Sequence, residues 1–125
     1  MKNKKEKPVC NKNFWIALDR LISESEIEID RPKGSCHPRR NELIYPVDYG
    51  YLKGTLSSDN SGIDLYRGSR EESIVDAIIC IVDLYKKNSE IKILIGCTDE
   101  EKKIIYRIYS EYYEGLQGIL LSRTN

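Results

Sequence analysis

The chain has 125 residues, a common length for one domain, and its 20 basic residues balance its 20 acidic ones. A net charge of zero gives no reason to expect nucleic acid or an acidic membrane as a partner, and no apolar run reaches the roughly 18 residues of a membrane span. The basic N-terminus MKNKKEKP has no apolar stretch behind it, so we expect a cytoplasmic protein without a signal peptide.

The N-terminal part predicts a tail and a helix. Residues 1–12 are mostly basic and polar, and we expect a flexible tail there, followed by a single domain over residues 13–125. Apolar side chains recur every three to four residues from Phe14 to Ile22, which predicts a short amphipathic helix. Its apolar face must pack somewhere, either over an open end of the domain or against another subunit.

The middle of the chain predicts strands separated by polar loops. Alternation over Glu26–Asp30 predicts a half-buried strand. The β-branched run Ile74–Leu84 predicts a long central strand, and a polar turn at Lys86–Ser89 connects it to a strand at Ile91–Ile95 as a hairpin. Further short strands are expected at Leu43–Tyr45, Ile63–Tyr66 and Gly118–Ser122.

A second helix is predicted near the C-terminus. Thr98 and Glu101 have the spacing of a capping box, and Gly115 is expected to end the helix. Because the strands follow one another without alternating helices, we expect a mainly β, or α+β, fold. A mainly antiparallel small barrel with appended N- and C-terminal helices is favoured over a doubly wound sheet.

Two polar regions gather charges of opposite sign. Acids and cations that meet in one site would hold Mg²⁺ and an anion respectively, an arrangement suited to phosphoryl hydrolysis. Without further information, solvated surface charges remain the simpler interpretation. The cations follow the first strand at Arg31, Lys33, His37, Arg39 and Arg40, and the acids are Asp59 and Asp64 around a second loop, with Glu28 and Glu90 on strands.

The segment Tyr45–Tyr51 (YPVDYGY), followed by Asp59–Leu65 (DNSGIDL), resembles two signatures of the soluble inorganic pyrophosphatases of the small-barrel type. In that family a Tyr-Pro-x-x-Tyr-Gly segment precedes Asp-Gly-Asp-Pro-Leu-Asp. The resemblance runs from about Glu26 to about Leu116. Three further elements carry it: Ile27-Glu28-Ile29 with Lys33-Gly34-Ser35, Glu90-x-Lys92, and Tyr113.

This resemblance implies a five-stranded, OB-like antiparallel barrel that hydrolyses inorganic pyrophosphate, or a related phosphoanhydride, with Mg²⁺. It implies Asp59, Asp64 and Glu90 as metal ligands, with Glu28 in an outer acidic shell. It also implies catalytic roles for Asp59, Asp64 and Tyr49. Since family members are commonly oligomers, a homo-oligomer stays open. The implied phosphate contacts are Tyr49, Lys33, Lys92, Tyr113 and one of Arg39 and Arg40.

Three departures from the family pattern weaken this expectation. Ser61 replaces the middle acid of the signature, and losing a positioned base typically costs roughly 10²–10⁴ in rate. A second metal-binding acid falls near residues 85–87, and Asp83 would need a shifted hairpin register to serve. Glu114 stands where the family has a lysine. The sequence thus predicts either a weakened or altered phosphohydrolase, or a degenerate module that binds a phosphate-bearing ligand or a partner protein.

Overall fold

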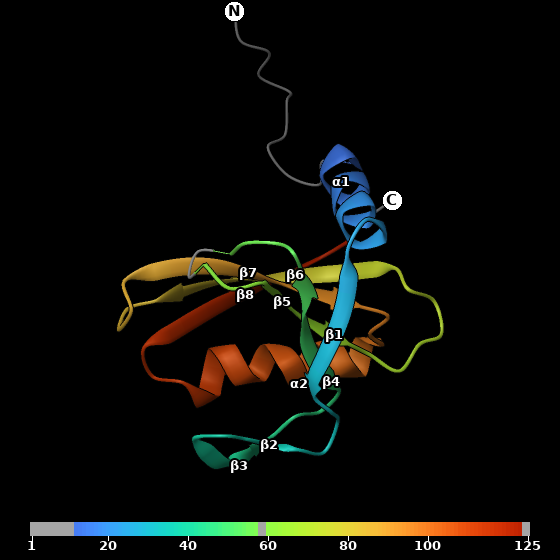
Figure 1. Ribbon diagram of the computed structural model, residues 1–125. Helices are drawn as coiled ribbons and strands as arrows, with labels where there is room; N and C mark the ends of the chain where they lie inside the picture. Colours follow the sequence, from blue (N-terminus) through green and yellow to red (C-terminus); the bar gives the residue numbers. More distant parts are fainter. Residues whose placement is uncertain (1–11, 58–59, 124–125) are drawn as a thin grey trace, which may run out of the picture.

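The computed structural model describes residues 12–57 and 60–123 (Figure 1). The predicted tail over residues 1–12 lies outside them except for Lys12, which begins the first helix. None of the described helices is long and apolar enough to cross a membrane. In chain order the elements are α1 (Lys12–Ser23), β1 (Glu26–Arg31), β2 (Cys36–His37), β3 (Arg40–Ile44), β4 (Asp48–Lys53), β5 (Ile63–Arg67), β6 (Val75–Asp83), β7 (Asn88–Ile95), α2 (Asp99–Arg107), the π-helical turn η1 (Ile108–Tyr112) and β8 (Leu116–Ser122).

Six strands form one mixed sheet in the order β1-β4-β5-β7-β6-β8, and β2 and β3 form a separate hairpin. Neighbouring strands are antiparallel except β5 and β7, which run parallel. After β5 the chain passes over the position next to it and forms β6 one place further along the sheet. The β6–β7 hairpin then places β7 between β6 and β5, where it runs parallel to β5. The mainly antiparallel, β-rich fold is confirmed.

The predicted five-stranded closed barrel is not confirmed. Within the described residues β1 and β8 each pair on one side only, so the sheet stays open and has six strands. The strand of this sheet that was not predicted is β4. Its polar and apolar residues do not alternate, because consecutive residues are buried on opposite faces of the sheet. A strand buried on both faces loses the period of two that reveals strands in a sequence.

Gly50 allows β4 to approach β1 closely. It pairs with Ile29 of β1, and a Cβ atom at this position would lie 1.9 Å from the backbone oxygen of Glu28. No side chain fits at that distance. The glycine therefore belongs to the fold, and it helps to hold Tyr49, its neighbour on β4, in a fixed place.

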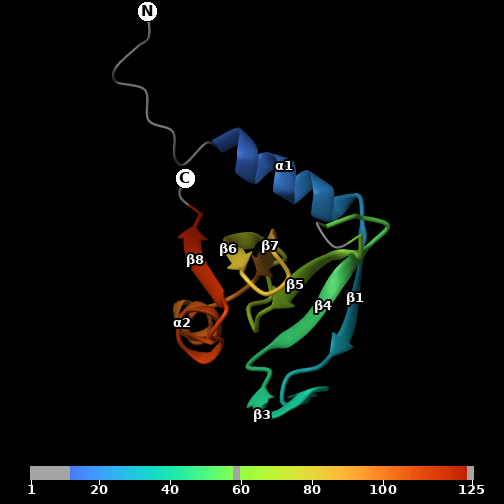
Figure 2. The same ribbon diagram turned by 90° about the vertical axis from the view of Figure 1, so that its left-hand side faces the viewer.

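The sheet separates two apolar clusters, and Figure 2 shows α1 on one side of it and α2 on the other. The amphipathic α1 confirms the predicted helix, and its buried Trp15 packs on the outer face against Ile78 and Ile93. On the inner face Ile105 and Ile108 pack against a cluster rich in tyrosine. The predicted helix at Phe14–Ile22 thus covers the sheet of its own chain.

The capping box predicted at the start of α2 is present. The Thr98 hydroxyl accepts a hydrogen bond from the Glu101 amide at 3.1 Å, and the Glu101 carboxylate accepts one from the Thr98 amide at 2.9 Å. The helix ends earlier than Gly115, because η1 widens the last turn and Tyr113 already has extended dihedral angles. This end of the helix delivers several tyrosines to the inner face of the sheet.

Candidate functional site

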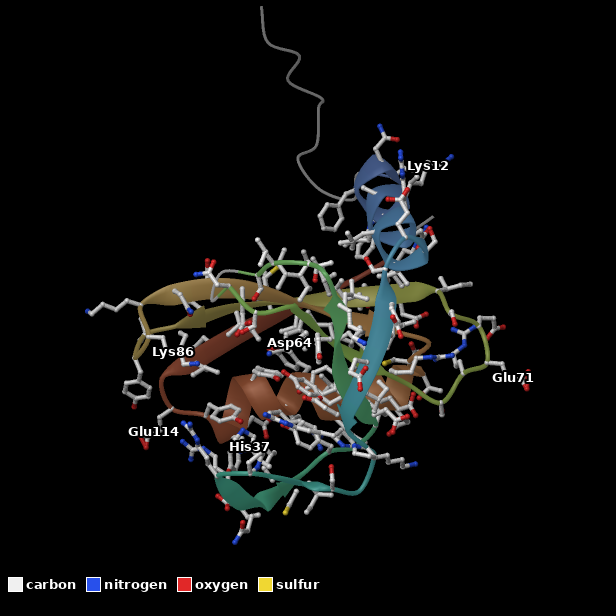
Figure 3. All side chains as sticks on the ribbon, viewed as in Figure 1. Lys12, His37, Asp64, Glu71, Lys86 and Glu114 are labelled. Carbon is white, nitrogen blue, oxygen red and sulfur yellow. The ribbon has the colours of Figure 1, made fainter. Side chains whose placement is uncertain are left out.

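A cleft of about 540 Å³ lies between the inner face of the sheet, η1 and the β2–β3 hairpin. In Figure 3 the labelled side chains of His37, Lys86 and Glu114 lie around one side of this region, and Asp64 lies nearer the middle of the sheet. Among the described residues, the charged lining balances four cations against four carboxylates. The cations are Arg31, Arg40, Lys86 and Lys92, and the acids are Asp64, Asp83, Glu90 and Glu114.

Lys92 is the buried cation at the floor of the cleft, with only 6% of its surface exposed. Its ammonium donates hydrogen bonds to Asp64 Oδ2 and to the Tyr49 hydroxyl, each at 2.8 Å, and lies 3.8 Å from Glu90 Oε2. The parallel pairing of β5 with β7, in which Leu65 lies opposite Ile93, brings Asp64 beside Lys92. Side chains of β4, β5 and β7 therefore meet at this ammonium.

The surroundings of this cluster keep Lys92 protonated and charged, and Tyr49 protonated and neutral. Burial disfavours an ammonium, but the Tyr49 oxygen and the carboxylates of Asp64 and Glu90 outweigh that effect and raise the pKa of Lys92. Burial also raises the pKa of Tyr49 well above its ordinary value. At neutral pH Lys92 is therefore a cation and Tyr49 a neutral phenol on the floor of the cleft.

A row of tyrosines lines the same cleft. Ring centroids lie 5.0 Å apart for Tyr45 and Tyr49, 4.9 Å for Tyr49 and Tyr66, and 6.4 Å for Tyr66 and Tyr109. The buried hydroxyls of Tyr66 and Tyr109 hydrogen-bond each other at 2.6 Å. Tyrosine combines the apolar area that a core needs with a hydroxyl that can point into the cleft. Tyr113 continues the row, 6.0 Å from Tyr109.

Two arginines rest on these rings. The Arg40 guanidinium lies 5.3 Å from the ring centre of Tyr113, and Arg31 lies 5.5 Å from that of Tyr49 and donates a hydrogen bond to the Tyr45 hydroxyl. Stacking on aromatic faces holds a guanidinium in place while its edge stays able to bind an anion. The resemblance left Arg39 and Arg40 as alternatives, and only Arg40 lines the cleft.

His37 contributes a donor to the cleft. Its Nδ1 accepts a hydrogen bond from the Arg39 amide at 3.1 Å, so the proton of the neutral ring lies on Nε2. Burial, followed by the charges of Arg31 and Arg40, lowers the pKa of His37 below its ordinary value of 6.5. Near neutral pH His37 is therefore an uncharged donor, and it is poorly suited to act as a base.

Asp83 is an acid of the cleft that the sequence analysis left outside the site. On β6 it lies opposite Asn88, while Ile81 lies opposite Glu90, so Asp83 and Glu90 share the inner face without any register shift. Asp83 Oδ1 accepts hydrogen bonds from the Tyr85 and Lys86 amides, both at 2.9 Å, and so closes the β6–β7 turn. No three His, Cys, Asp or Glu side chains of the described residues come together as a metal site.

The cleft brings together six of the predicted site residues: Arg40, Tyr49, Asp64, Glu90, Lys92 and Tyr113. Glu28 is not among its lining residues and instead lies 3.5 Å from Lys53. Lys33 and Arg39 are exposed in loops outside it. Asp59 lies outside the described residues. Ser61 is exposed and does not line the cleft.

Several lining residues were not predicted from the sequence as site residues, and one signal could have found most of them. Nine tyrosines against one phenylalanine is a ratio that favours a hydroxyl-lined cleft over simple packing. Arg31 was named only as one of the cations after the first strand, and no comparable signal marks Lys86, because exposed cations are common in turns. The missed residues are Arg31, Tyr45, Tyr66, Asp83, Lys86, Tyr109 and Tyr112.

No family model matches this chain, and no curated protein sequence does. Its fold is similar to the crystal structure of an inorganic phosphatase from Anaplasma phagocytophilum, with 13% sequence identity and a TM-score of 0.51. The alignment covers 78% of this chain and 81% of that chain. At this identity the similarity concerns the fold alone, so the chain has an inorganic-phosphatase-like fold.

Proposed function

We propose that the cleft binds the magnesium complex of inorganic pyrophosphate, or of a related phosphoanhydride, and hydrolyses it slowly. One observation carries this proposal. Arg40 and Lys92, from separate strands, face the same cleft as Asp64 and Glu90, in a fold similar to that of an inorganic phosphatase. Cations beside carboxylates are what a phosphate with its magnesium requires.

The cleft offers enough donors for a phosphoanhydride. Arg40 and Arg31 can each present two N–H groups to phosphate oxygens, a geometry that suits this anion. Lys86 at the rim and the Nε2 hydrogen of His37 add further donors. Glu114 at the rim opposes an anion, so we expect weaker binding than in a cleft with a lysine at this position.

The site is better suited to Mg²⁺ that arrives bound to the substrate than to Mg²⁺ held by the protein alone. Asp64 and Glu90 supply the one or two carboxylates that Mg²⁺ uses when phosphate and water complete its shell. The described residues offer no cluster of three ligands. In its complex with phosphate, Mg²⁺ acidifies bound water and neutralises charge on the anhydride.

Within this proposal the chain's own residues position the reaction. Asp64 orients a water for in-line attack on phosphorus, and the hydrogen bond from Lys92 holds that side chain in place. Arg40 stabilises the charge that develops on the leaving phosphate. Lys92 occupies one oxygen of Asp64, so we expect slow turnover.

A second candidate function is binding without turnover. The observation that favours it is the pairing of Lys92 with both Asp64 and Glu90, which satisfies the two carboxylates within the protein. Carboxylates held by a lysine recruit metal and water less readily than free ones. In this case the cleft recognises a phosphate-bearing ligand, or a partner protein, and leaves it intact.

The test is phosphate release from magnesium pyrophosphate by the purified protein. We expect slow, Mg²⁺-dependent release that Asp64→Asn reduces by roughly 10²-fold or more, the usual cost of losing a positioned acid–base group. Glu28→Gln is the matched control, because this carboxylate is not among the lining residues of the cleft. An equal loss in both variants would contradict the role given to Asp64.

The binding alternative predicts a different pattern. Pyrophosphate should then raise the unfolding free energy by about 2.7 kcal/mol at a hundredfold excess over Kd, with no phosphate released. The absence of both stabilisation and phosphate release would reject a phosphoanhydride as the ligand.

A further inference from the structure

The two edges of the sheet are built differently. Edge strand β1 carries the acids Glu26, Glu28 and Asp30, and its pairing with β4 has a bulge between Ile29 and Arg31. Charges and bulges are the devices that protect an edge from pairing with another chain. Edge strand β8, with the sequence LQGILLS, has neither charge nor proline, and its register with β6 is unbroken along its length.

Hydrogen bonds on either side of β8 show which backbone groups face outward. The Leu84 amide donates to the Gly115 oxygen at 2.9 Å, and the Arg123 amide donates to the Asp76 oxygen at 2.8 Å. Alternation of the antiparallel ladder from these pairs directs the N–H and C=O groups of Gly118, Leu120 and Ser122 away from β6. No other described strand pairs with them.

The surroundings of this edge suit an added strand. A groove of about 550 Å³ runs between β8 and α2, lined by Lys103, Tyr106 and Leu120 among others. In Figure 2, β8 stands at one end of the sheet with α2 beside it. On the opposite face Ile119 and Leu121 are 58% and 44% exposed, which leaves apolar surface at the open edge.

We propose that β8 is the dimer interface of this protein, with β8 of a second copy pairing antiparallel to it. A two-fold axis through Leu120, perpendicular to the sheet, places Gly118 of one copy opposite Ser122 of the other. Gly118, Leu120 and Ser122 of each strand then gain ladder partners. Ile119 and Leu121 meet their counterparts on the outer face, and the closed two-fold arrangement leaves no bare edge at β8.

The charges of α2 support a second copy as the occupant. Acids lie at the start of this helix, at Asp99 and Glu100, Lys103 lies at its middle, and the basic Arg107 lies in its last turn. The same two-fold axis runs the two α2 helices antiparallel, so the acids of one face the bases of the other. Lys103 and Arg107 form no ion pair with the residues that the structure describes.

The test is the molar mass in solution, measured by light scattering over a wide range of concentrations. We expect the wild-type chain at twice its monomer mass of 14.5 kDa. Ile119→Lys places a charge on the open edge, and Ser122→Pro removes an outward amide without touching the bonds to β6. Both variants should shift to the single-chain mass and keep the circular dichroism spectrum of the wild type.

Val82→Lys is the matched control. Val82 lies on the same face and is 53% exposed, but it belongs to the interior strand β6, so this variant should remain dimeric. A wild-type chain at the single-chain mass at every concentration would overturn the proposal and leave the edge open to a segment of another protein. A dimer that survives both edge substitutions would also overturn it, because the interface would then lie elsewhere.

Discussion

Lys92 shows how one residue can set the character of a site. A lysine that is 6% exposed remains charged only because Asp64, Glu90 and Tyr49 surround its ammonium. Burying a charge with partners contributes little net stability, whereas removing one partner leaves the others uncompensated. The stability of this cluster therefore depends on all of these contacts together.

We expect Lys92→Met to lower the free energy of unfolding by about 3 kcal/mol, because Asp64 and Glu90 lose their buried counter-charge. Denaturant unfolding measures this. The control is Lys53→Met, since Lys53 forms an exposed pair with Glu28 at 3.5 Å and its loss should cost less than about 1 kcal/mol. Adding Asp64→Asn to Lys92→Met should recover part of the loss, and strictly additive effects would contradict the coupling.

At the scale of elements, contacts between near neighbours in the sequence start α2, and a contact with a distant segment fixes its position. Its start is specified locally by Thr98 and Glu101, and Glu101 also accepts a hydrogen bond from the Ser69 amide at 3.2 Å in the loop after β5. This carboxylate therefore connects the cap of α2 to a distant segment. The turn η1, which carries Tyr109 and Tyr112 of the cleft, directly follows this anchored helix.

Thr98→Ala should lower the free energy of unfolding by about 1 kcal/mol, because the Glu101 amide loses its acceptor. Thr98→Ser keeps a hydroxyl at this position and should stay close to the wild type. Thermal or denaturant unfolding of the three proteins measures the difference. If alanine and serine had the same effect, the methyl group of Thr98 would be responsible and the cap would not.

At the scale of the whole molecule, two apolar clusters share one sheet. Trp15 of α1 packs on the outer cluster and Ile105 of α2 on the inner one, while β6 and β7 contribute side chains to both. If either helix unfolded, it would expose β6 and β7, whose side chains also form the cluster on the other face of the sheet. We therefore expect one cooperative unfolding transition for the whole domain.

Trp15→Ala and Ile105→Ala should each cost about 3 kcal/mol through lost apolar contact and the cavity left behind. Both should move the same transition, with backbone and tyrosine circular dichroism changing together. Ile104→Ala is the control, because this neighbour of Ile105 is 44% exposed and should change stability little. Two separate transitions in either core variant would show that the clusters fold independently.

Local patterns predicted most elements but not their assembly. The helix around Trp15, the capping box at Thr98 and the β6–β7 hairpin follow from periodicity and turn chemistry over a few residues. The strand β4 was missed because it is buried on both faces, and the end of α2 was misplaced because η1 responds to packing against the sheet. Asp83 was set aside because the hairpin register depends on which residues close its turn.

The sequence alone was sufficient for the β-rich class, since composition, alternation and short motifs are local properties, and it predicts the residue types of the proposed phosphate site. Tertiary structure was needed to choose Arg40 over Arg39, to bring Lys92 to Asp64 across a parallel strand pair, and to leave β8 as a bare edge. These features depend on strand order and register. Contacts between residues far apart in the chain set both, and no local pattern encodes them.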